Sequence, residues 1–381
     1  MKIAHIGLAA CYTEGMTYQD NQLAEQNARD RHKVMYISNA AKYENGAIVE
    51  TGYEDVLLPG GVRLVRMPYV HVLNRFVSSK FRKVQGLYPL LKDFAPDVIL
   101  SHNLSYWSVL DVIRYKKAHP EVKFYADTHT TAYNSGTNWL SLQVLHRGLY
   151  RYLTQKALPY LEKYLYVGEE ERQFSLQNYG VPESLMEFYP LGGRLLPEKE
   201  YQAARSKRRA ELGLAEDELL LVHSGKLSPQ KRTDELLRAF AAVPELNARL
   251  TVIGSIPEDR KDLLTSLIEA DRRVSYLGWK SGDELQEYLC ACDLYCQPGS
   301  VSATMQNAVC RNCGILSYPH KDYVKDLDYE NILWAETEED IEEMFRQIQG
   351  DPTLLKSLRK GSRRCAQELL DYRKLATRLY Q

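Results

Sequence analysis

Short apolar runs alternate with longer segments of helical periodicity from one end of the chain to the other. The runs have the length of buried strands, and apolar positions three and four apart in the intervening segments indicate helices. Strands that are apolar on both faces and separated by helices are typical of parallel sheets covered on both sides. The pattern therefore predicts an α/β fold, with a doubly wound sandwich in each half of the chain.

The expected elements follow the same order in both halves. In the first half the strands are Lys2–Leu8, Val34–Ile37, Val98–Ser101, Phe124–Ala126 and Leu165–Val167, and the helices are Tyr18–Asp30, Arg82–Lys92, Trp107–Ala118 and Leu142–Leu161. In the second half the strands are Leu219–Val222, Leu250–Ile253, Val274–Tyr276, Leu294–Cys296 and Ile315–Ser317, and the helices are Thr233–Ala242, Asp259–Ala270, Asp283–Cys290, Ala303–Asn312 and Glu338–Gln349.

The length of the chain, 381 residues, favours two domains over one large core. A segment with two prolines and two glycines, Tyr189–Glu198, interrupts the pattern and is typical of a linker. We place the boundary near Leu195, which gives domains over residues 1–195 and 196–360. Residues 361–381 continue a helical pattern, and we expect this last segment to return to the first domain.

Charge and terminal sequence limit the class of protein. The formal net charge is -1, so there is no overall basic field that would recruit nucleic acid. The first residues have the pattern of a short strand instead of a signal peptide, and no stretch approaches the ~20 apolar residues of a membrane span. We expect a cytoplasmic protein that has no nucleic-acid partner.

Cysteines crowd into two short segments, Cys290–Cys296 and Cys310–Cys313. The second has the Cys-x-x-Cys spacing of half a metal site. However, Cys290 and Cys292 are two positions apart at a predicted helix end and therefore face different ways. Buried structural thiols explain the segments better than a metal site does, and disulfides are not expected in a cytoplasmic chain.

The loops that follow the second-half strands carry the candidate chemistry, because open parallel sheets bind ligands beyond the carboxyl ends of their strands. Lys226 and Lys231 lie in such a loop, just before a helix. Two ammonium groups, exposed backbone N–H groups and the positive end of a helix dipole together suit a diphosphate. The alternative is that both lysines are solvated surface charges.

A second loop, Gln297–Thr304, precedes the next helix and offers N–H groups and hydroxyls to an anion. The candidates in it are Gly299, Ser300, Ser302 and Thr304, and a plain helix N-cap is the alternative explanation. Gly254 ends the strand between these two loops in sequence and belongs to the same set of strand-end candidates.

Several motifs occur in register from Ser224 to Cys296: Ser-Gly-Lys-Leu-x3-Lys, Leu-Leu-x-Ala-Phe, Leu-Thr-Val-Ile-Gly, Val-Ser-Tyr-Leu-Gly and Cys-Asp-Leu-Tyr-Cys. In this respect the chain resembles the family 4 retaining glycosyltransferases. The resemblance implies the GT-B architecture, in which two Rossmann-like domains face each other across a cleft. It also implies that the second domain holds a nucleotide sugar and the first holds the acceptor.

By this resemblance, Lys226 and Lys231 match the basic pair that neutralises the donor diphosphate as the sugar leaves, without an obligatory cofactor or a metal ion. The family usually carries two glutamates eight residues apart in the following loop. This chain has Pro298 and Gln306 there. Gln306 can still hydrogen-bond a ribose diol, but the loss of the first carboxylate leaves the donor sugar undefined. A UDP-sugar is favoured over a GDP-sugar, and Trp279 is a candidate for stacking near the base.

In the first half, the resemblance points to the loop after the first strand and to a strand-end histidine. Gly15 would let the backbone approach a phosphate, while Tyr18 and Asn21 would line the acceptor side. His129 matches the histidine that the family places beside the transferred sugar, where it positions and polarises. The neighbouring strand end, Ser101–Asn103, is better explained by a structural role.

A group of basic residues interleaved with apolar ones precedes and enters the predicted helix Arg82–Lys92. A surface of this kind suits anionic lipid headgroups, and a solvated face is the alternative. Peripheral contact with the inner face of the membrane is therefore a further prediction. The basic members are Arg63, Arg66, Arg75, Lys80, Arg82 and Lys83.

The expected function is transfer of a hexose from a nucleotide sugar, with retention, onto a cell-surface glycan or lipid-linked precursor. The main alternative is a catalytically silent GT-B module that binds a glycan or a partner transferase. A nucleotide-sugar epimerase is a weaker alternative, because no paired carboxylates are placed for proton abstraction.

Overall fold

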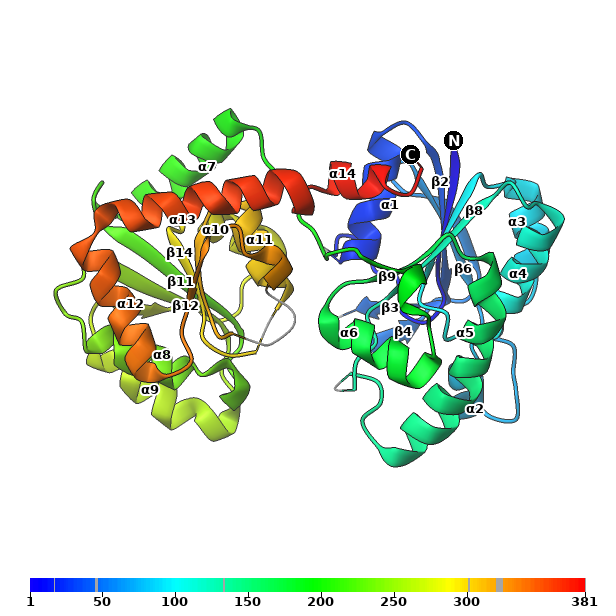
Figure 1. Cartoon of the computed structure of the whole chain (residues 1–381), viewed down its shortest axis with the longest axis horizontal. Helices are drawn as coiled ribbons and strands as arrows, with labels where there is room; N and C mark the ends of the chain where they lie inside the picture. The colour runs from blue at the N-terminus through cyan, green and yellow to red at the C-terminus, as the bar shows by residue number, and fades with distance from the viewer. Residues whose placement is uncertain (17, 45–46, 133, 301, 320–324, 381) are drawn as a thin grey trace. The chain divides into compact units, whose positions relative to one another are not determined.

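A computed structural model describes residues 1–16, 18–44, 47–132, 134–300, 302–319 and 325–380. The chain divides into two compact units: unit 1 consists of Met1–Pro190 and Tyr372–Gln381, and unit 2 of Leu191–Asp371 (Figure 1). The chain thus leaves unit 1 at Pro190 and returns to it after Asp371. Residues 361–371 belong to unit 2, and only the final segment returns.

Unit 1 is built on a sheet in which every strand is parallel except β5, which pairs antiparallel with β6 at one edge. The strand order is β10-β9-β8-β7-β1-β2-β6-β5. A separate antiparallel pair, β3 (Ala41–Glu44) and β4 (Ala47–Glu50), follows β2. The strands of the main sheet are β1 (Lys2–Gly7), β2 (Lys33–Asn39), β5 (Glu54–Leu57), β6 (Val62–Met67), β7 (Val98–His102), β8 (Lys123–Thr128), β9 (Lys163–Tyr166) and β10 (Met186–Phe188).

Helices cover both faces of this sheet, and Figure 1 shows α1 on one face and α3 and α4 on the other. The core beneath α3 and α4 includes Leu87, Leu91 and Val112, and a second cluster packs Leu23 of α1 against Leu100 of β7. The helices are α1 (Gln19–Arg29), α2 (Arg75–Phe81), α3 (Leu87–Phe94), α4 (Val109–Ala118), the π-helical η1 (Ser141–Tyr150), α5 (Arg151–Ala157), α6 (Glu169–Phe174) and α14 (Tyr372–Thr377).

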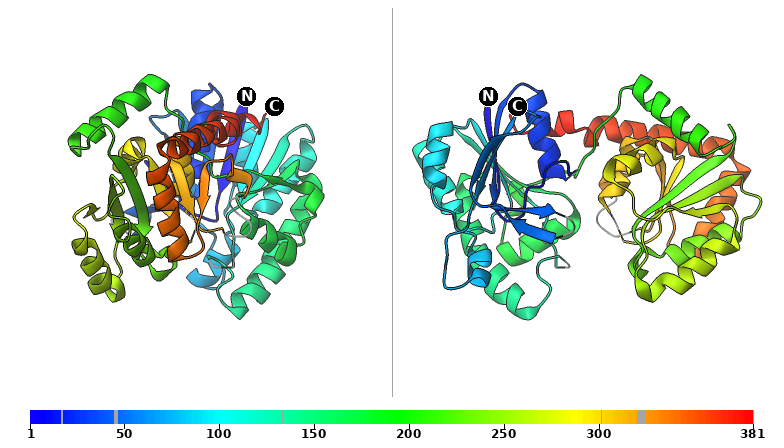
Figure 2. Two further views of the ribbon diagram at one scale, coloured as in Figure 1. Left: turned by 60° about the vertical axis from the view of Figure 1, so that its left-hand side comes forward. Right: turned by 180° about the vertical axis from the view of Figure 1, so that it is seen from behind.

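Unit 2 is a fully parallel sheet with the strand order β13-β12-β11-β14-β15-β16. Its central strands are buried on both faces, which explains their continuous apolar sequences. Helices flank the sheet on both sides, as the two views of Figure 2 show. The strands are β11 (Leu219–Lys226), β12 (Ala248–Ser255), β13 (Val274–Tyr276), β14 (Leu294–Gln297), β15 (Gly314–Ser317) and β16 (Ile332–Trp334). The helices are α7 (Glu198–Glu211), α8 (Thr233–Ala241), α9 (Lys261–Ala270), α10 (Gly282–Ala291), α11 (Ala303–Cys310), α12 (Glu338–Gly350) and α13 (Pro352–Cys365).

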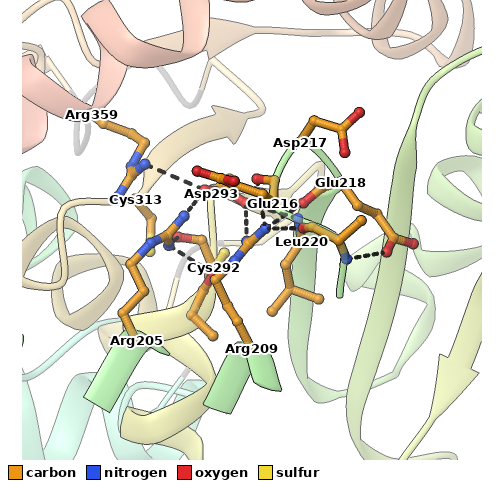
Figure 3. Close-up of polar contacts among 12 residues, drawn as sticks. Arg205, Arg209, Glu216, Asp217, Glu218, Leu220, Cys292, Asp293, Cys313 and Arg359 are labelled. Carbon is orange, nitrogen blue, oxygen red and sulfur yellow. Dashed lines mark hydrogen bonds and ion pairs between the residues drawn. The ribbon is translucent and has the colours of Figure 1, made fainter. Parts of the chain in front are cut away.

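Asp293, just before β14, binds α7 to the sheet at the end opposite the strand-end loops. Arg205 and Arg209 of α7 and Arg359 of α13 converge on its carboxylate, which also accepts the backbone N–H of Leu220 at 2.9 Å (Figure 3). Asp293 is almost wholly buried. The arginines donate further bonds to carbonyl groups of α10 and of the α7–β11 loop, so this cluster is structural.

Several expected elements differ from the structure by a residue or two at their ends, and one expected helix does not form as a single element. The helix predicted over Arg82–Lys92 is wrong, because Arg82 adopts a left-handed conformation with φ 51° that ends α2, and α3 begins only after Gly86. The Arg82 side chain holds this turn by donating to the Ser105 carbonyl at 2.9 Å and to its hydroxyl at 2.6 Å. The strand predicted at Leu165–Val167 lies instead at Lys163–Tyr166.

All seven cysteines are free thiols, and six of them are buried. Burial raises the pKa of the Cys296, Cys310 and Cys365 thiols, which keeps them neutral. Within the described residues, no group of three or more potential ligands could hold a metal ion. No helix in the described ranges combines the length and apolarity that crossing a bilayer requires.

Candidate functional site

The lysine loop and the Gly299 loop lie at the point where the strand order of unit 2 reverses. Strands β12 and β13 extend from β11 on one side, and β15 and β16 extend from β14 on the other. The loop after β11 and the loop after β14 therefore leave neighbouring strands in opposite senses. In open α/β sheets such a switch point forms a crevice that binds ligands.

Lys231 joins the two loops. It closes a short 3-10 turn, Pro229–Lys231, and its buried ammonium group donates to the Ser300 carbonyl at 2.8 Å. The backbone N–H of Ser300 in turn donates to the Gln230 carbonyl at 2.8 Å. Burial lowers the pKa of Lys231 to about 8, so the ammonium is still predominantly protonated at neutral pH.

Lys226 is the last residue of β11 and lies in a different environment. Its side chain is exposed, and among the described residues the ammonium has no hydrogen-bond or ion-pair partner. The structure therefore places Lys231 in the wall of the loop pair and Lys226 in solvent at the same edge of the sheet.

Three glycines allow the loops to approach one another closely. Gly225 and Gly254 are register partners on β11 and β12, with φ of 139° and 142°. A Cβ at Gly254 would lie 1.7 Å from the Gly225 carbonyl oxygen, and one at Gly299 would lie 2.1 Å from that of Gln230. Both main-chain groups of Gly254 are already bonded, to Gly278 and to the Tyr276 hydroxyl. Gly254 thus has a steric role in the structure.

The residues that precede α11 leave the start of that helix uncapped. Ser302 occupies the N-cap position, but its hydroxyl donates to Oε1 of Gln297 at 2.8 Å and does not cap the first turn. Ser302 and Thr304 also lie within hydrogen-bonding reach of the Tyr295 hydroxyl. The positive end of α11 therefore opens beside the Lys231 turn, which suits an anion.

Gln306 is fully buried, and its Oε1 accepts the Gly192 N–H at 2.9 Å. Its carbonyl oxygen is thus engaged by the start of unit 2, and a ribose hydroxyl that donates to Oε1 would have to share or replace this bond. Sequence spacing placed Gln306 correctly on α11 but gave no sign of the Gly192 contact.

His223 is a structural residue that the sequence did not single out. Its Nδ1 lies 2.8 Å from the Cys296 carbonyl and its Nε2 lies 2.9 Å from the Thr233 hydroxyl, so the ring ties β14 and α8 to β11. Burial lowers the pKa of His223 to about 4, and the neutral ring adds no charge beside Lys231.

In unit 1, the loop after β1 has the open backbone that the sequence predicts at Gly15. Its φ is 78°, and nothing lies within 4 Å of where a Cβ would be. Tyr18 is exposed, whereas Asn21 is buried and donates from Nδ2 to the Thr13 carbonyl at 2.9 Å. Asn21 therefore shapes the loop from inside.

His129 follows β8 at the carboxyl end of the sheet, and 41% of its side chain is exposed. Its carbonyl accepts from Asn134 at 2.6 Å, which fixes the backbone at this position. Ser101 donates to the Asn103 carbonyl at 2.7 Å, in agreement with the structural role expected for it. Trp279, in unit 2, is exposed over 73% of its surface.

The basic residues expected to form one face do not do so. Arg66 is fully buried and pairs with Glu14 and Glu54, Arg63 pairs with Asp55, and Arg75 pairs with Glu50. Three of the six charges are thus paired with carboxylates of unit 1, and the buried Arg66 is withdrawn from the surface, so the six residues do not form one continuous basic surface.

Comparisons with known proteins agree with this architecture. HepE of Anabaena, crystallised with UDP, superposes with a TM-score of 0.68 at 14% identity, covering 99% of this chain and 98% of HepE. Sucrose-phosphate synthase of Thermosynechococcus elongatus gives a TM-score of 0.67 at 14% identity over 99% of this chain and 97% of that one. WaaG, a glycosyltransferase involved in lipopolysaccharide biosynthesis, gives 0.61 at 15% identity over 99% of both chains. The chain thus has the GT-B fold, with two Rossmann-like units.

Residues 204–360, which lie within unit 2, match the family model described as Glycosyl transferases group 1. A D-inositol 3-phosphate glycosyltransferase of Stackebrandtia nassauensis is 36% identical over 99 residues. That match covers 23% of this chain and 22% of the relative.

Proposed function

We propose that the chain is a nucleotide-sugar-dependent glycosyltransferase whose unit 2 binds the donor. The observation that carries the proposal is the Lys231 ammonium, held at the switch point beside the Gly299 turn and the uncapped start of α11. When a glycosidic bond to a diphosphate breaks, negative charge develops on the leaving group, and a fixed cation stabilises it. Lys226 supplies a second, mobile cation at the same edge.

The donor is proposed to be a UDP-hexose. Support comes from the GT-B neighbours that were crystallised with UDP, UDP-glucose or UDP-2-fluoro glucose. A thermal-shift panel of UDP-, GDP-, ADP- and TDP-sugars tests this, because a ligand at 100 times its dissociation constant stabilises the folded state by about 2.7 kcal/mol. A shift with UDP-sugars alone is expected, and a shift with GDP-sugars alone would contradict the assignment.

Lys226→Ala separates a transferase from a silent GT-B module. Because Lys226 is exposed, the variant should fold normally, yet donor turnover should fall by about 100-fold or more through loss of leaving-group stabilisation. The matched control is Lys207→Ala, which removes an exposed lysine of α7, the helix that Asp293 holds at the end of the sheet opposite the strand-end loops. If donor turnover were unchanged in Lys226→Ala, the two lysines could not be the groups that stabilise the leaving diphosphate.

We further propose retention of anomeric configuration, family 4 membership, and a cell-surface glycan or lipid-linked acceptor bound by unit 1, with His129 beside the transferred sugar. The motifs from Ser224 to Cys296 support family 4, and the exposed His129 ring at a strand end supports the acceptor side. Proton NMR of the product from an α-linked UDP-hexose should show an α-anomeric signal. A β-anomeric signal would refute retention.

Peripheral membrane contact is proposed through exposed apolar side chains of unit 1, in place of the basic face predicted from the sequence. Leu73, Phe76, Trp139 and Leu140 are each more than 60% exposed. Co-sedimentation with vesicles containing phosphatidylglycerol tests this, with Phe76→Ser/Trp139→Ser as the variant expected to lose binding. Equal sedimentation of both proteins would exclude these side chains as the contact.

A further inference from the structure

A line of hydrogen-bonded side chains crosses unit 1 at the switch point of its own sheet, between β1 and β7. Asn27 of α1 lies 2.8 Å from Nε2 of His5 on β1, and Nδ1 of His5 lies 3.0 Å from Nε2 of His102 on β7. Nδ1 of His102 lies 2.6 Å from Oδ2 of Asp127 on β8. These side chains are buried, and the line runs toward the carboxyl ends of the strands, where His129 lies.

The proton positions along this line follow from the orientation of the Asn27 amide, whose oxygen faces His5. Asn27 offers its carbonyl oxygen, so His5 donates from Nε2, and a neutral His5 must accept at Nδ1. His102 then donates from both nitrogens and is an imidazolium. Burial and the neighbouring His102 lower the pKa of His5 to about 3, which agrees with a neutral ring.

Asp127 carries the matching negative charge. Burial alone would raise its pKa, but the charge and hydrogen bond of His102, together with His129 and the backbone N–H of Asn103, outweigh burial and hold the pKa of Asp127 below its ordinary value. Burial opposes protonation of His102 as well, yet the carboxylate raises its pKa overall. Unit 1 therefore contains a buried His102–Asp127 ion pair.

Only one of the two carboxylate oxygens of Asp127, Oδ2, is hydrogen-bonded to His102. Oδ1 is buried and has no hydrogen-bond partner in the described structure, and it lies 3.8 Å from Nε2 of His129. This distance is too long for a hydrogen bond but short enough for a small rotation of the half-exposed His129 ring to make one. A buried carboxylate oxygen without a partner is costly, so the contact would be favourable.

We infer that Asp127, locked by His102, is a positioning residue that accepts Nε2–H of His129 and thereby leaves Nδ1 of His129 as a hydrogen-bond acceptor for a substrate hydroxyl. The inference rests on the proposed function in assigning the hydroxyl to a saccharide. Hydrogen bonds of this kind are often long in unliganded enzymes and shorten in the complex. Asp127 acts through His129 and does not touch substrate.

The other polar groups around the line leave this arrangement intact. Tyr36 stacks on His5 and His102 and donates its hydroxyl to Asp20 at 2.6 Å, so Asp20 is already engaged. Burial raises the pKa of Tyr36, of Tyr164 and of Tyr189. These hydroxyls stay neutral and therefore do not act as bases toward the His129 proton.

Nitrogen-15 NMR of histidine-labelled full-length protein tests the inference without relying on activity. At pH 8, where ordinary histidines are neutral, the His129 ring, assigned by its loss in His129→Gln, should carry its proton on Nε2 with UDP bound. Asp127→Asn should shift this ring toward a mixture of tautomers. An Nδ1–H ring in the wild type, or the same tautomer in both proteins, would overturn the inference.

Asp127→Asn leaves a buried imidazolium unpaired, and this variant could fail to fold. The double variant Asp127→Asn/His102→Gln removes both charges and should show the same change in the His129 tautomer. His146→Gln is the matched control, because His146 is also a buried histidine of unit 1 but pairs with Tyr179 at 2.7 Å. It should leave the His129 spectrum unchanged.

Measuring kcat and KM for sugar transfer distinguishes a failure of this inference from a failure of the proposed function. Asp127→Asn should lower kcat for transfer at least tenfold with little change in KM for the donor, and it should have no further effect in a His129→Gln background. Additive losses would contradict a shared role. If no transfer occurs in the wild type, the proposed function falls, while the tautomer result still decides whether Asp127 positions His129.

Discussion

Lys226 and Lys231 are five positions apart and end at the same edge of one sheet, but only Lys231 is buried. Burial gives Lys231 a fixed position through the Ser300 carbonyl and lowers its pKa to about 8. The loops could be predicted from sequence because strand ends and glycines are local signals. The different environments of the two lysines could not, since they depend on how the Gly299 turn packs.

The titration of Lys231 makes donor binding depend on pH. An anionic ligand binds the ammonium form, so the dissociation constant for a UDP-sugar should be nearly constant from pH 6.5 to 7.5. It should rise as pH passes about 8, by up to tenfold per pH unit. Lys231→Met, which keeps the length but loses the charge, should bind more weakly and without this dependence. Calorimetric titration measures both, and a parallel pH dependence in the variant would refute the assignment.

Gly254→Ala should destabilise unit 2 by at least ~2 kcal/mol, because φ of 142° is unfavourable for alanine and the new Cβ would meet the Gly225 carbonyl. Gly213→Ala is the control. It has φ of 62° and open space, so it should cost only about 1 kcal/mol. Urea unfolding compares the two, and equal losses would show that the close approach of β11 and β12 is unimportant.

Predicted and observed elements agree best where a strand is buried on both faces. Strands β7, β14 and β15 are such cases, and their apolar runs located them to within a residue or two. Helix α7 was missed because its surface is highly charged and only Tyr201 is buried. What holds α7 is its arginines on Asp293, a contact between segments distant in the sequence.

In unit 1, the hydrogen-bonded line from Asn27 through His5 and His102 to Asp127 also depends on contacts that the sequence does not reveal. His129 follows its strand directly and could be predicted, whereas the partnership of His5, His102 and Asp127 depends on strand order. A sequence shows that β1, β7 and β8 exist, but not that they are neighbours in register. The contact between Gln306 and Gly192 could not be predicted either, because it depends on where the segment between the two units runs.

Removing Asp293 should loosen α7 from the sheet. Asp293→Ala leaves three arginines without their shared carboxylate and the Leu220 N–H without its acceptor, so we expect a loss of about 3–5 kcal/mol. Glu287→Ala removes the ion pair of Arg208 between α7 and α10, in which the Glu287 side chain is about half exposed, and should cost about 1 kcal/mol. Denaturant unfolding monitored by circular dichroism measures the difference. Equal effects would contradict a structural role for the cluster.

At the scale of the whole molecule, the last residues of the chain complete the core of unit 1. Tyr372, Leu375 and Leu379 are buried in the cluster that contains Ile3 and Leu100. The Tyr189 hydroxyl donates to the Leu375 carbonyl at 2.7 Å, and Tyr380 donates to Asp30 at 2.8 Å. The C-terminal segment is therefore part of the fold of unit 1.

A chain that ends at Asp371 should have a markedly less stable unit 1. Exposing the apolar side chains beneath α14 costs on the order of 3–6 kcal/mol, since each buried large side chain contributes ~1.5–3 kcal/mol. Lys374→Ala, at an exposed position of the same helix, should change stability by less than about 0.5 kcal/mol. Thermal unfolding of the three proteins provides the comparison, and an unchanged first transition in the truncated chain would contradict the expectation.

The return of α14 also bears on the order in which the protein matures during synthesis. Domains generally fold as they leave the ribosome, from the N-terminus onward. Here residues 1–190 emerge first but lack the helix that fills one face of their sheet, and residues 191–371 must be translated before it arrives. The unit that is translated first therefore becomes complete last, and until α14 has left the ribosome the unfilled apolar face of unit 1 is a natural substrate for chaperones.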